Sequence, residues 1–334
     1  MSNNNMRFSP EVFCTLGLEM AGFTVRVAST KTNVRRFNSA YGCTWFVVAA
    51  TWNSLWDAKH PVMNTRGVEN KHILWALMMM KSGDSEHAVA GRLQIRSEKT
   101  LRKWAWAFIL AIADLDNMKV SQQTKAIIFI HFSEEQQRSL LSFVVLVLQI
   151  LLSNRFIGDQ MYDCLISVDC VDCKIAEPWP MNKESKKWYS EKYNCSALRY
   201  EIGVSILGGD IVWVNGPFLP GKLNDATIFQ FKGLLSHLEE NERIEADSGY
   251  QHLDPTFVKS KSGVTHKPIN EGMRNTVRAR HELVNRGIKS FNSIKNVFAA
   301  KQITKHQHLF TAAAVLVQVS FELGENNYTV EYNG

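Results

Sequence analysis

The spacing of hydrophobic and polar positions divides the chain into a helical first part and a second part that alternates strands and helices. In 69–83, apolar residues recur at helical spacings, and 85–94 and 96–112 continue as two further helix-forming segments. Ser85 begins the second of these segments and is of a residue type that caps helices. The first part of the chain is therefore predicted to be helical.

These three helices, with a tight connection before the last, follow the order of a helix-turn-helix. In the third helix, Leu101, Trp104 and Phe108 are expected to pack inwards. The opposite face carries residues that would contact DNA, namely Arg96, Lys99, Thr100, Arg102 and Lys103. A plain helical bundle with a basic rim gives the same pattern, so both interpretations stand at this point.

The second part of the chain alternates strand and helix patterns. Strands are predicted at 165–175, 199–207 and 210–214, with a hairpin turn at Gly208-Gly209 between the last two. The segments that follow are a helix near 225–238 capped by Asn224 or Asp225, a strand at 243–247, a short strand near 263–267 and a helix from about 273 to 290. This order predicts a mixed α/β sheet.

Three acidic residues lie where these elements would bring them together. Asp169 is in the first strand, Asp247 ends the strand 243–247, and Glu282 lies 35 residues further on in the long helix. Carboxylate oxygens are the ligands that Mg²⁺ prefers, and a pair of such ions can clamp the attacking and leaving oxygens of a phosphodiester. The acids therefore indicate a site for Mg²⁺ or Mn²⁺.

Two more acids are secondary candidates for this site. Asp172 is three residues from Asp169, and an odd offset in a strand points the two side chains to opposite faces. Asp225 begins a helix, where a capping or peripheral role is natural. We therefore favour Asp169 and Asp247 as metal ligands over these two.

The helix around Glu282 carries cations on the same face as the acid. At 100° per residue, Arg278, Asn285 and Lys289 share the face of Glu282. Arg278 and Lys289 are therefore candidates for contacts with DNA phosphates, and salt bridges on a solvated helix are the alternative. His281, the neighbour of Glu282, is expected at the surface.

Several longer segments resemble the DDE superfamily endonucleases, specifically transposases of the PIF/Harbinger type and the host proteins derived from them. They are SVDCVDCKIAEP (167–178), the stretch 187–229 that ends in PGKLNDATIF, EADSGY (245–250) and RARHELVNRGIKSF (278–291).

The resemblance implies a ribonuclease H-like fold, with the first acid on the first strand, the second just after the fourth and the third on a following helix. It also implies a metal-dependent DNA endonuclease or transposase, in which Asp169, Asp247 and Glu282 are the catalytic and metal-binding residues. A catalytically silent DNA-binding protein that keeps the fold is the alternative.

The charge of the chain supports a nucleic-acid partner. Its 334 residues include 38 Lys and Arg against 32 Asp and Glu, which gives a net charge of +6. The segment 259–305 alone holds eleven basic and two acidic residues. Such an excess attracts phosphate backbones, although a solvated basic helix face has the same composition. We expect double-stranded DNA as the partner, with a separate DNA-binding partner protein and a homo-oligomer as further expectations.

The domain organisation follows from these patterns. A helical DNA-binding region is predicted at 1–118, a helical connector or insertion at 119–160 and the catalytic domain at 161–334. An apolar run of 13 residues at 140–152 is too short for a membrane span, and an inserted helix pair and a retained intron both account for it. The polar N-terminus and the scattered cysteines favour an intracellular protein, and we expect it in the nucleus.

Overall fold

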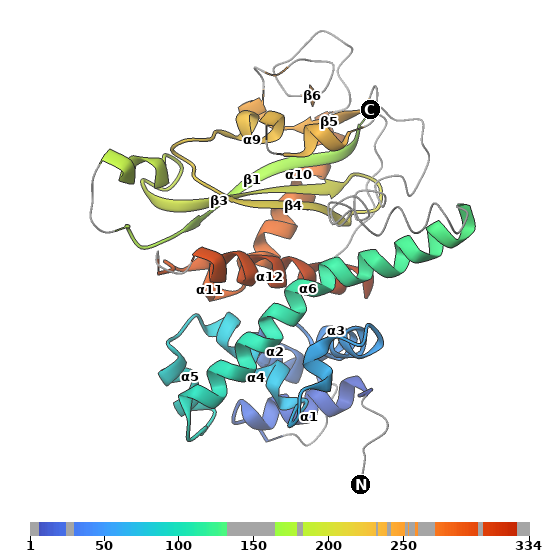
Figure 1. The fold of residues 1–334 in the computed structure, drawn as a ribbon, viewed down its shortest axis with the longest axis vertical. Coiled ribbons are helices and arrows are strands. Elements are labelled where there is room, and N and C mark those ends of the chain that lie inside the picture. The colour runs from blue at the N-terminus through green and yellow to red at the C-terminus, as the bar shows by residue number, and fades with distance from the viewer. Residues whose placement is uncertain are drawn as a thin grey trace. The chain divides into compact units, whose positions relative to one another are not determined.

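The computed structural model describes residues 7–24, 30–131, 164–178, 183–231, 233–238, 242–250, 253, 258–259, 271–299 and 303–325. They form two compact units (Figure 1). The first takes in the described residues of Met1–Met118, Gly287–Phe298 and Thr304–Glu325, and the second takes in those of Lys119–Arg286 and Ala299–Ile303.

The first unit is helical and uses segments from both halves of the chain. Its described elements are α1 (Pro10–Met20), α2 (Lys31–Tyr41), α3 (Trp45–Asp57), η1 (Pro61–Asn64), α4 (Lys71–Ser82), α5 (Glu86–Arg92), the first part of α6 (Glu98–His131), α11 (Asn292–Lys295) and most of α12 (Ile303–Glu322). Helix α4 is buried on all sides from His72 to Met80, as expected for a helix that is apolar all round. It contacts α1, α2, α3, α5 and α11, so it is the centre of this unit.

The C-terminal segments of this unit pack against its N-terminal helices. Lys81 Nζ donates a hydrogen bond to the carbonyl of Ser290 at 2.7 Å. Thr44 Oγ1 donates to the Glu325 carboxylate. The helical unit is therefore built from two regions that lie about 200 residues apart in the sequence. Among the described helices, none is both long enough and apolar enough to cross a membrane.

The second unit holds an open, mixed sheet. Its strands are β1 (Cys164–Lys174), β2 (Tyr189–Ser190), β3 (Cys195–Ser205), β4 (Ile211–Phe218), β5 (Arg243–Ala246) and β6 (Val258–Lys259). The order is β2-β3-β1-β5-β6, and β4 also pairs with β3. β3 runs antiparallel to β1, β2 and β4, whereas β1, β5 and β6 are parallel to one another. The predicted hairpin between β3 and β4 is confirmed.

Helices flank this sheet, so the predicted α/β fold is confirmed. α9 (Asp225–Phe231) packs Phe229 into a core with Val168 of β1 and Ala246 of β5. α10 (Glu271–Ile288) buries Val277, Arg280, His281, Val284 and Ile288, which recur at helical spacings. The short strand predicted near 263–267 and the apolar run 140–152 lie outside the described residues.

The start of α9 shows how the sequence sets a local boundary. Asn224 Oδ1 accepts a hydrogen bond from the backbone N–H of Thr227 at 2.8 Å. Asn224 is therefore the N-cap, because its side chain satisfies one of the amides that the first helical turn leaves without a partner. Of the two predicted caps, this leaves the side chain of Asp225 available for other contacts.

Candidate active site

Asp169 and Asp247 follow paired positions on neighbouring strands. Val168 of β1 and Ala246 of β5 are partners in a parallel register, and each aspartate comes directly after one of them. Neighbouring strands lie about 4.8 Å apart, so the register alone brings the two carboxylates close together. Asp169 is half-buried, and Asp247 is exposed.

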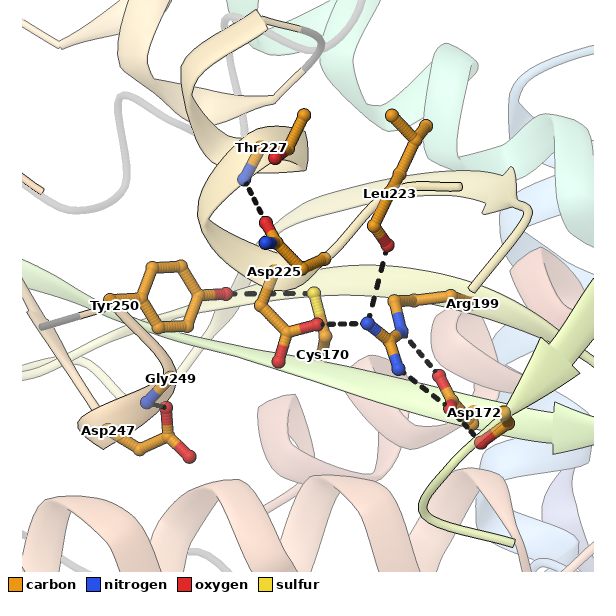
Figure 2. Close-up of polar contacts among 11 residues, drawn as sticks. Cys170, Asp172, Arg199, Leu223, Asp225, Thr227, Asp247, Gly249 and Tyr250 are labelled. Atoms are coloured by element: carbon orange, nitrogen blue, oxygen red, sulfur yellow. Dashed lines mark hydrogen bonds and ion pairs between the residues drawn. The ribbon is translucent and has the colours of Figure 1, made fainter. Parts of the chain in front are cut away.

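A small gap beside Gly249 lies between two carboxylates. A Cβ at Gly249 would lie 3.0 Å from Asp247 Oδ1 and 3.5 Å from Asp225 Oδ2. Gly249 also fixes the Asp247 side chain, because its backbone N–H donates to Asp247 Oδ1 at 2.8 Å. Figure 2 shows Asp225 between the Asp247 side of this gap and Arg199. Asp225, which sequence reasoning ranked second, therefore lies beside Asp247.

Arg199 of β3 joins Asp225 to Asp172. Its Nε and Nη2 donate to the two oxygens of Asp172 at 2.7 and 2.9 Å, and its Nη1 donates to Asp225 Oδ1 at 2.6 Å (Figure 2). Ser190 Oγ adds a hydrogen bond to Asp172 Oδ2 at 2.6 Å. Asp172 is 2% exposed, so its charge needs these partners. Both of its oxygens are thus taken up by contacts inside the fold.

The charges around Asp225 compete. Burial raises the pKa of the Asp225 carboxyl above its ordinary value, and Arg199 acts in the opposite direction. Asp169, Asp172 and Asp247 raise this pKa further. Like charges that come close disfavour ionisation, so these carboxylates form one electrostatic group with Arg199 as its cation.

Helix α10 reaches the same site through Asn285. Asn285 Nδ2 donates to Asp169 Oδ2 at 3.4 Å. Glu282 is one turn earlier on the same face and is exposed, and Arg278, one turn before that, is half-buried. Helix α10 ends at Ile288, so Lys289 lies in the turn after the helix and not on its regular face as predicted.

Two neighbours of Glu282 attach α10 to the sheet. His281 Nε2 bonds the carbonyl of Ser167 in β1 at 2.7 Å, and Arg280 Nη1 donates to the carbonyl of Ile206 at 2.6 Å. Both side chains are buried. The expectation of a surface position for His281 is therefore wrong, because α10 turns this side chain toward β1. Burial lowers the pKa of His281.

The donor set at this site suits a hard divalent cation. The side chains of Asp169, Asp225 and Asp247 offer carboxylate oxygens, which Mg²⁺ prefers, and the missing Cβ of Gly249 leaves space between two of them. In the part of the chain that the structure describes, no group of three or more His, Cys, Asp and Glu side chains is arranged to hold a metal ion. The residue types thus fit such an ion, and the present side-chain positions do not enclose it.

The N-terminal candidates for DNA contact lie at the start of α6. Leu101, Trp104 and Phe108 are buried, as predicted. The expected DNA-facing side chains are exposed, namely Arg96, Lys99, Thr100, Arg102 and Lys103. Arg102 Nε donates to the Glu86 carboxylate of α5, and Lys103 Nζ lies 4.7 Å from the centre of the Trp104 ring.

Sequence reasoning missed Arg199 and Arg280. A signal for both exists, since Arg199 interrupts the apolar strand 195–205 and Arg280 occupies a core-facing position of α10. Arginine and aspartate are almost never fully buried unless they are paired. A charged residue at a core position therefore predicts a partner, but the sequence alone does not name it.

Comparison with known proteins gives one match. Residues 168–318 match the DDE superfamily endonuclease family. The matched range begins one residue before Asp169 and includes Asp225, Asp247 and Glu282. Endonucleases of this superfamily generally use divalent metal ions and act on DNA. No curated protein and no solved structure matches the chain. The DDE superfamily match suggests a nuclease or transposase type of function.

Proposed function

We propose that the protein is a metal-dependent DNA endonuclease of the PIF/Harbinger transposase type. The observation that carries the proposal is the parallel pairing of Val168 with Ala246, which sets Asp169 and Asp247 side by side within the region of the DDE superfamily match. Glu282 on α10 is the third acid, and Asn285 ties its helix face to Asp169. We assign Asp169, Asp247 and Glu282 as both metal-binding and catalytic residues.

The sheet supports a ribonuclease H-like assignment. Asp169 lies on the first strand of the sheet, Asp247 follows the fourth of the strands longer than two residues, and Glu282 lies on a later helix. That arrangement is the one expected of such a fold. When bound, a pair of divalent ions would stabilise the attacking and leaving oxygens of a phosphodiester during in-line displacement.

The residues of the chain would contribute position and charge to this reaction. Asp247 is oriented by the Gly249 amide, and Asp169 is held by Asn285. These contacts reduce the freedom that the carboxylates would lose on holding a cation. Arg278, on the face of Glu282, would meet a DNA phosphate as a charge-assisted donor.

The α4, α5 and α6 segments would supply a helix-turn-helix. Its exposed basic residues include Arg96, Lys99, Arg102 and Lys103, and they would hold the DNA backbone. Lys289 would add a phosphate contact from the turn after α10. A DNA substrate places the protein in the nucleus, and recognition of a particular DNA sequence would come from this segment or from a partner protein.

Nicking of supercoiled DNA tests the proposal. The full chain should nick the plasmid when Mg²⁺ or Mn²⁺ is present and should not do so in EDTA. Asp247→Asn and Glu282→Gln should reduce the rate by more than the roughly 10–100-fold that loss of an outer-shell partner costs. Both variants should still bind DNA. Glu191→Gln, which removes an exposed carboxylate from the turn between β2 and β3, is the matched control and should nick at the wild-type rate.

A catalytically silent DNA-binding protein is the second candidate. It is favoured by the finding that no three metal-ligating side chains in the described ranges are arranged around one ion. A wild-type chain that is folded and binds DNA, but nicks it with neither Mg²⁺ nor Mn²⁺, would establish this alternative and contradict the endonuclease proposal.

A further inference from the structure

Arg199 is shared between two carboxylates with different surroundings. Three of its nitrogens donate to them, two to Asp172 and one to Asp225. The Arg199 side chain is 14% exposed, so these bonds form largely out of water. A planar guanidinium fixes both the distance and the angle of its partners, which a lysine ammonium does not.

The two carboxylates differ in what remains available. Asp172 uses Oδ1 for Arg199, and its Oδ2 accepts from both Arg199 and Ser190. Asp225 uses Oδ1 for Arg199, while its Oδ2 borders the gap beside Gly249, opposite Asp247 Oδ1. Asp225 is also not needed as a helix cap, because Asn224 fills that position.

We propose that Arg199 is a positioning residue that holds Asp225 as a further carboxylate of the metal site. This inference rests on the proposed function. Asp172 is the buried counter-charge that fixes the guanidinium, and Asp225 is the carboxylate that the guanidinium directs toward the gap shared with Asp247. The ligand is a hard divalent cation, and Asp225 would contribute one oxygen to it.

The alternative is that Asp225 only neutralises Arg199. The two accounts differ in how substitutions combine. If Arg199 acts through Asp225, its replacement should weaken cation binding in the wild-type chain and have no further effect once the Asp225 carboxylate is gone. If Arg199 supports the fold alone, the two effects should add, because independent sites add.

Calorimetric titration of the full chain with Mn²⁺ distinguishes these accounts without relying on DNA cleavage. We expect Asp225→Asn to weaken Mn²⁺ binding about 10–100-fold and Arg199→Lys to weaken it about 10-fold, the range for partners that orient a metal ligand. The double variant should bind as Asp225→Asn does. Glu201→Gln removes another buried carboxylate of β3, one that accepts from Trp213 at 2.7 Å. It is the matched control and should bind Mn²⁺ as the wild type does.

Loss of the fold is controlled by a second variant and by thermal unfolding of each protein. Asp172→Asn/Arg199→Gln removes the buried ion pair as a unit and leaves no lone buried charge, yet it also releases Asp225. It should weaken Mn²⁺ binding to the same extent as Arg199→Lys or more.

The outcomes separate the inference from the proposed function. If Asp225→Asn binds Mn²⁺ as the wild type does while Asp247→Asn does not, the role of Asp225 and Arg199 is overturned and the metal-dependent function stands. Additive losses in the double variant overturn the positioning role of Arg199. A folded wild-type chain that binds no Mn²⁺ overturns the proposed function and this inference together.

Discussion

Asn285 of α10 donates a hydrogen bond to the Asp169 carboxylate of β1, with 3.4 Å between Nδ2 and Oδ2. The bond connects residues that are 116 positions apart in the sequence, and it places the helix face that carries Glu282 beside the strand that carries Asp169. The position of α10 on β1 therefore controls how the candidate carboxylates are spaced.

His281 should be one of the residues that set this position. His281→Leu removes the donor to the Ser167 carbonyl and leaves a buried acceptor without its partner, which costs about 1–3 kcal/mol of unfolding free energy. We expect Mn²⁺ binding to weaken about 10-fold as well, because Glu282 loses its support. Urea unfolding and Mn²⁺ titration of the full chain measure both effects.

His281→Gln serves as the conservative variant, because its amide can donate to the same carbonyl. It should recover part of the stability and part of the Mn²⁺ affinity. A leucine variant with wild-type stability and affinity would show that this hydrogen bond does not position the helix.

Gly249 should be required for the gap between Asp247 and Asp225. In Gly249→Ala the new Cβ would lie 3.0 Å from Asp247 Oδ1, so the carboxylate has to move. We expect Mn²⁺ affinity to fall about 10-fold, a loss in the range for displaced ligands. Gly91→Ala in α5 is the control, since a Cβ there meets nothing within 4 Å. That control should keep its affinity and gain up to about 1 kcal/mol of stability. Equal affinity of both variants would argue against a cation in this gap.

Arg102 and Lys103 should contribute to DNA binding if α4 to α6 form a helix-turn-helix. Replacing both with alanine should weaken binding and reduce the slope of log K against log salt by roughly one unit for each DNA phosphate that the variant no longer neutralises. Arg102 also pairs with Glu86, but such exposed pairs contribute little to stability, so the fold should persist. Fluorescence anisotropy at several salt concentrations measures the slope. An unchanged slope would assign this segment to a packed bundle only.

The Glu201 carboxyl should make stability depend on pH. Burial raises its pKa from about 4.5 to about 7, partly offset by the hydrogen bond from Trp213. Because the folded-state pKa is the higher one, the protonated form favours folding below pH 4.5, and this contribution is lost as the pH rises through about 7. Glu201→Gln should therefore be more stable than wild type at pH 8, by at most about 3 kcal/mol, and equally stable near pH 4.5. Unfolding curves that differ by the same amount at both pH values would contradict a buried, titrating carboxyl.

The sequence predicted those parts of the structure that depend on local patterns. The strand of Asp169, the hairpin between β3 and β4 and the inward face of α6 follow from periodicity and turn residues, which act within a few positions. The cap of α9 follows from a side chain next to the backbone that it bonds.

The partners of Arg199 could not be predicted in this way. Arg199 is opposite Asp172 only because of the register between β1 and β3, and that register depends on the chain between them. The close approach of Asp225 further requires the placement of α9 on the sheet. Similarly, the hydrogen bond between Lys81 and Ser290 joins segments 209 positions apart, and no local pattern signals it.

Anomalous diffraction from crystals of the full chain grown with Mn²⁺ tests the central claim most directly. The account predicts a Mn²⁺ peak within coordination distance of Asp169 and Asp247, on the side of β1 and β5 that α10 and Gly249 border. In Asp247→Asn crystals prepared in the same way, this peak should be weaker or absent. Folded wild-type crystals with no Mn²⁺ at these carboxylates, or with Mn²⁺ bound only elsewhere, would contradict a metal-dependent nuclease site built on Asp169 and Asp247.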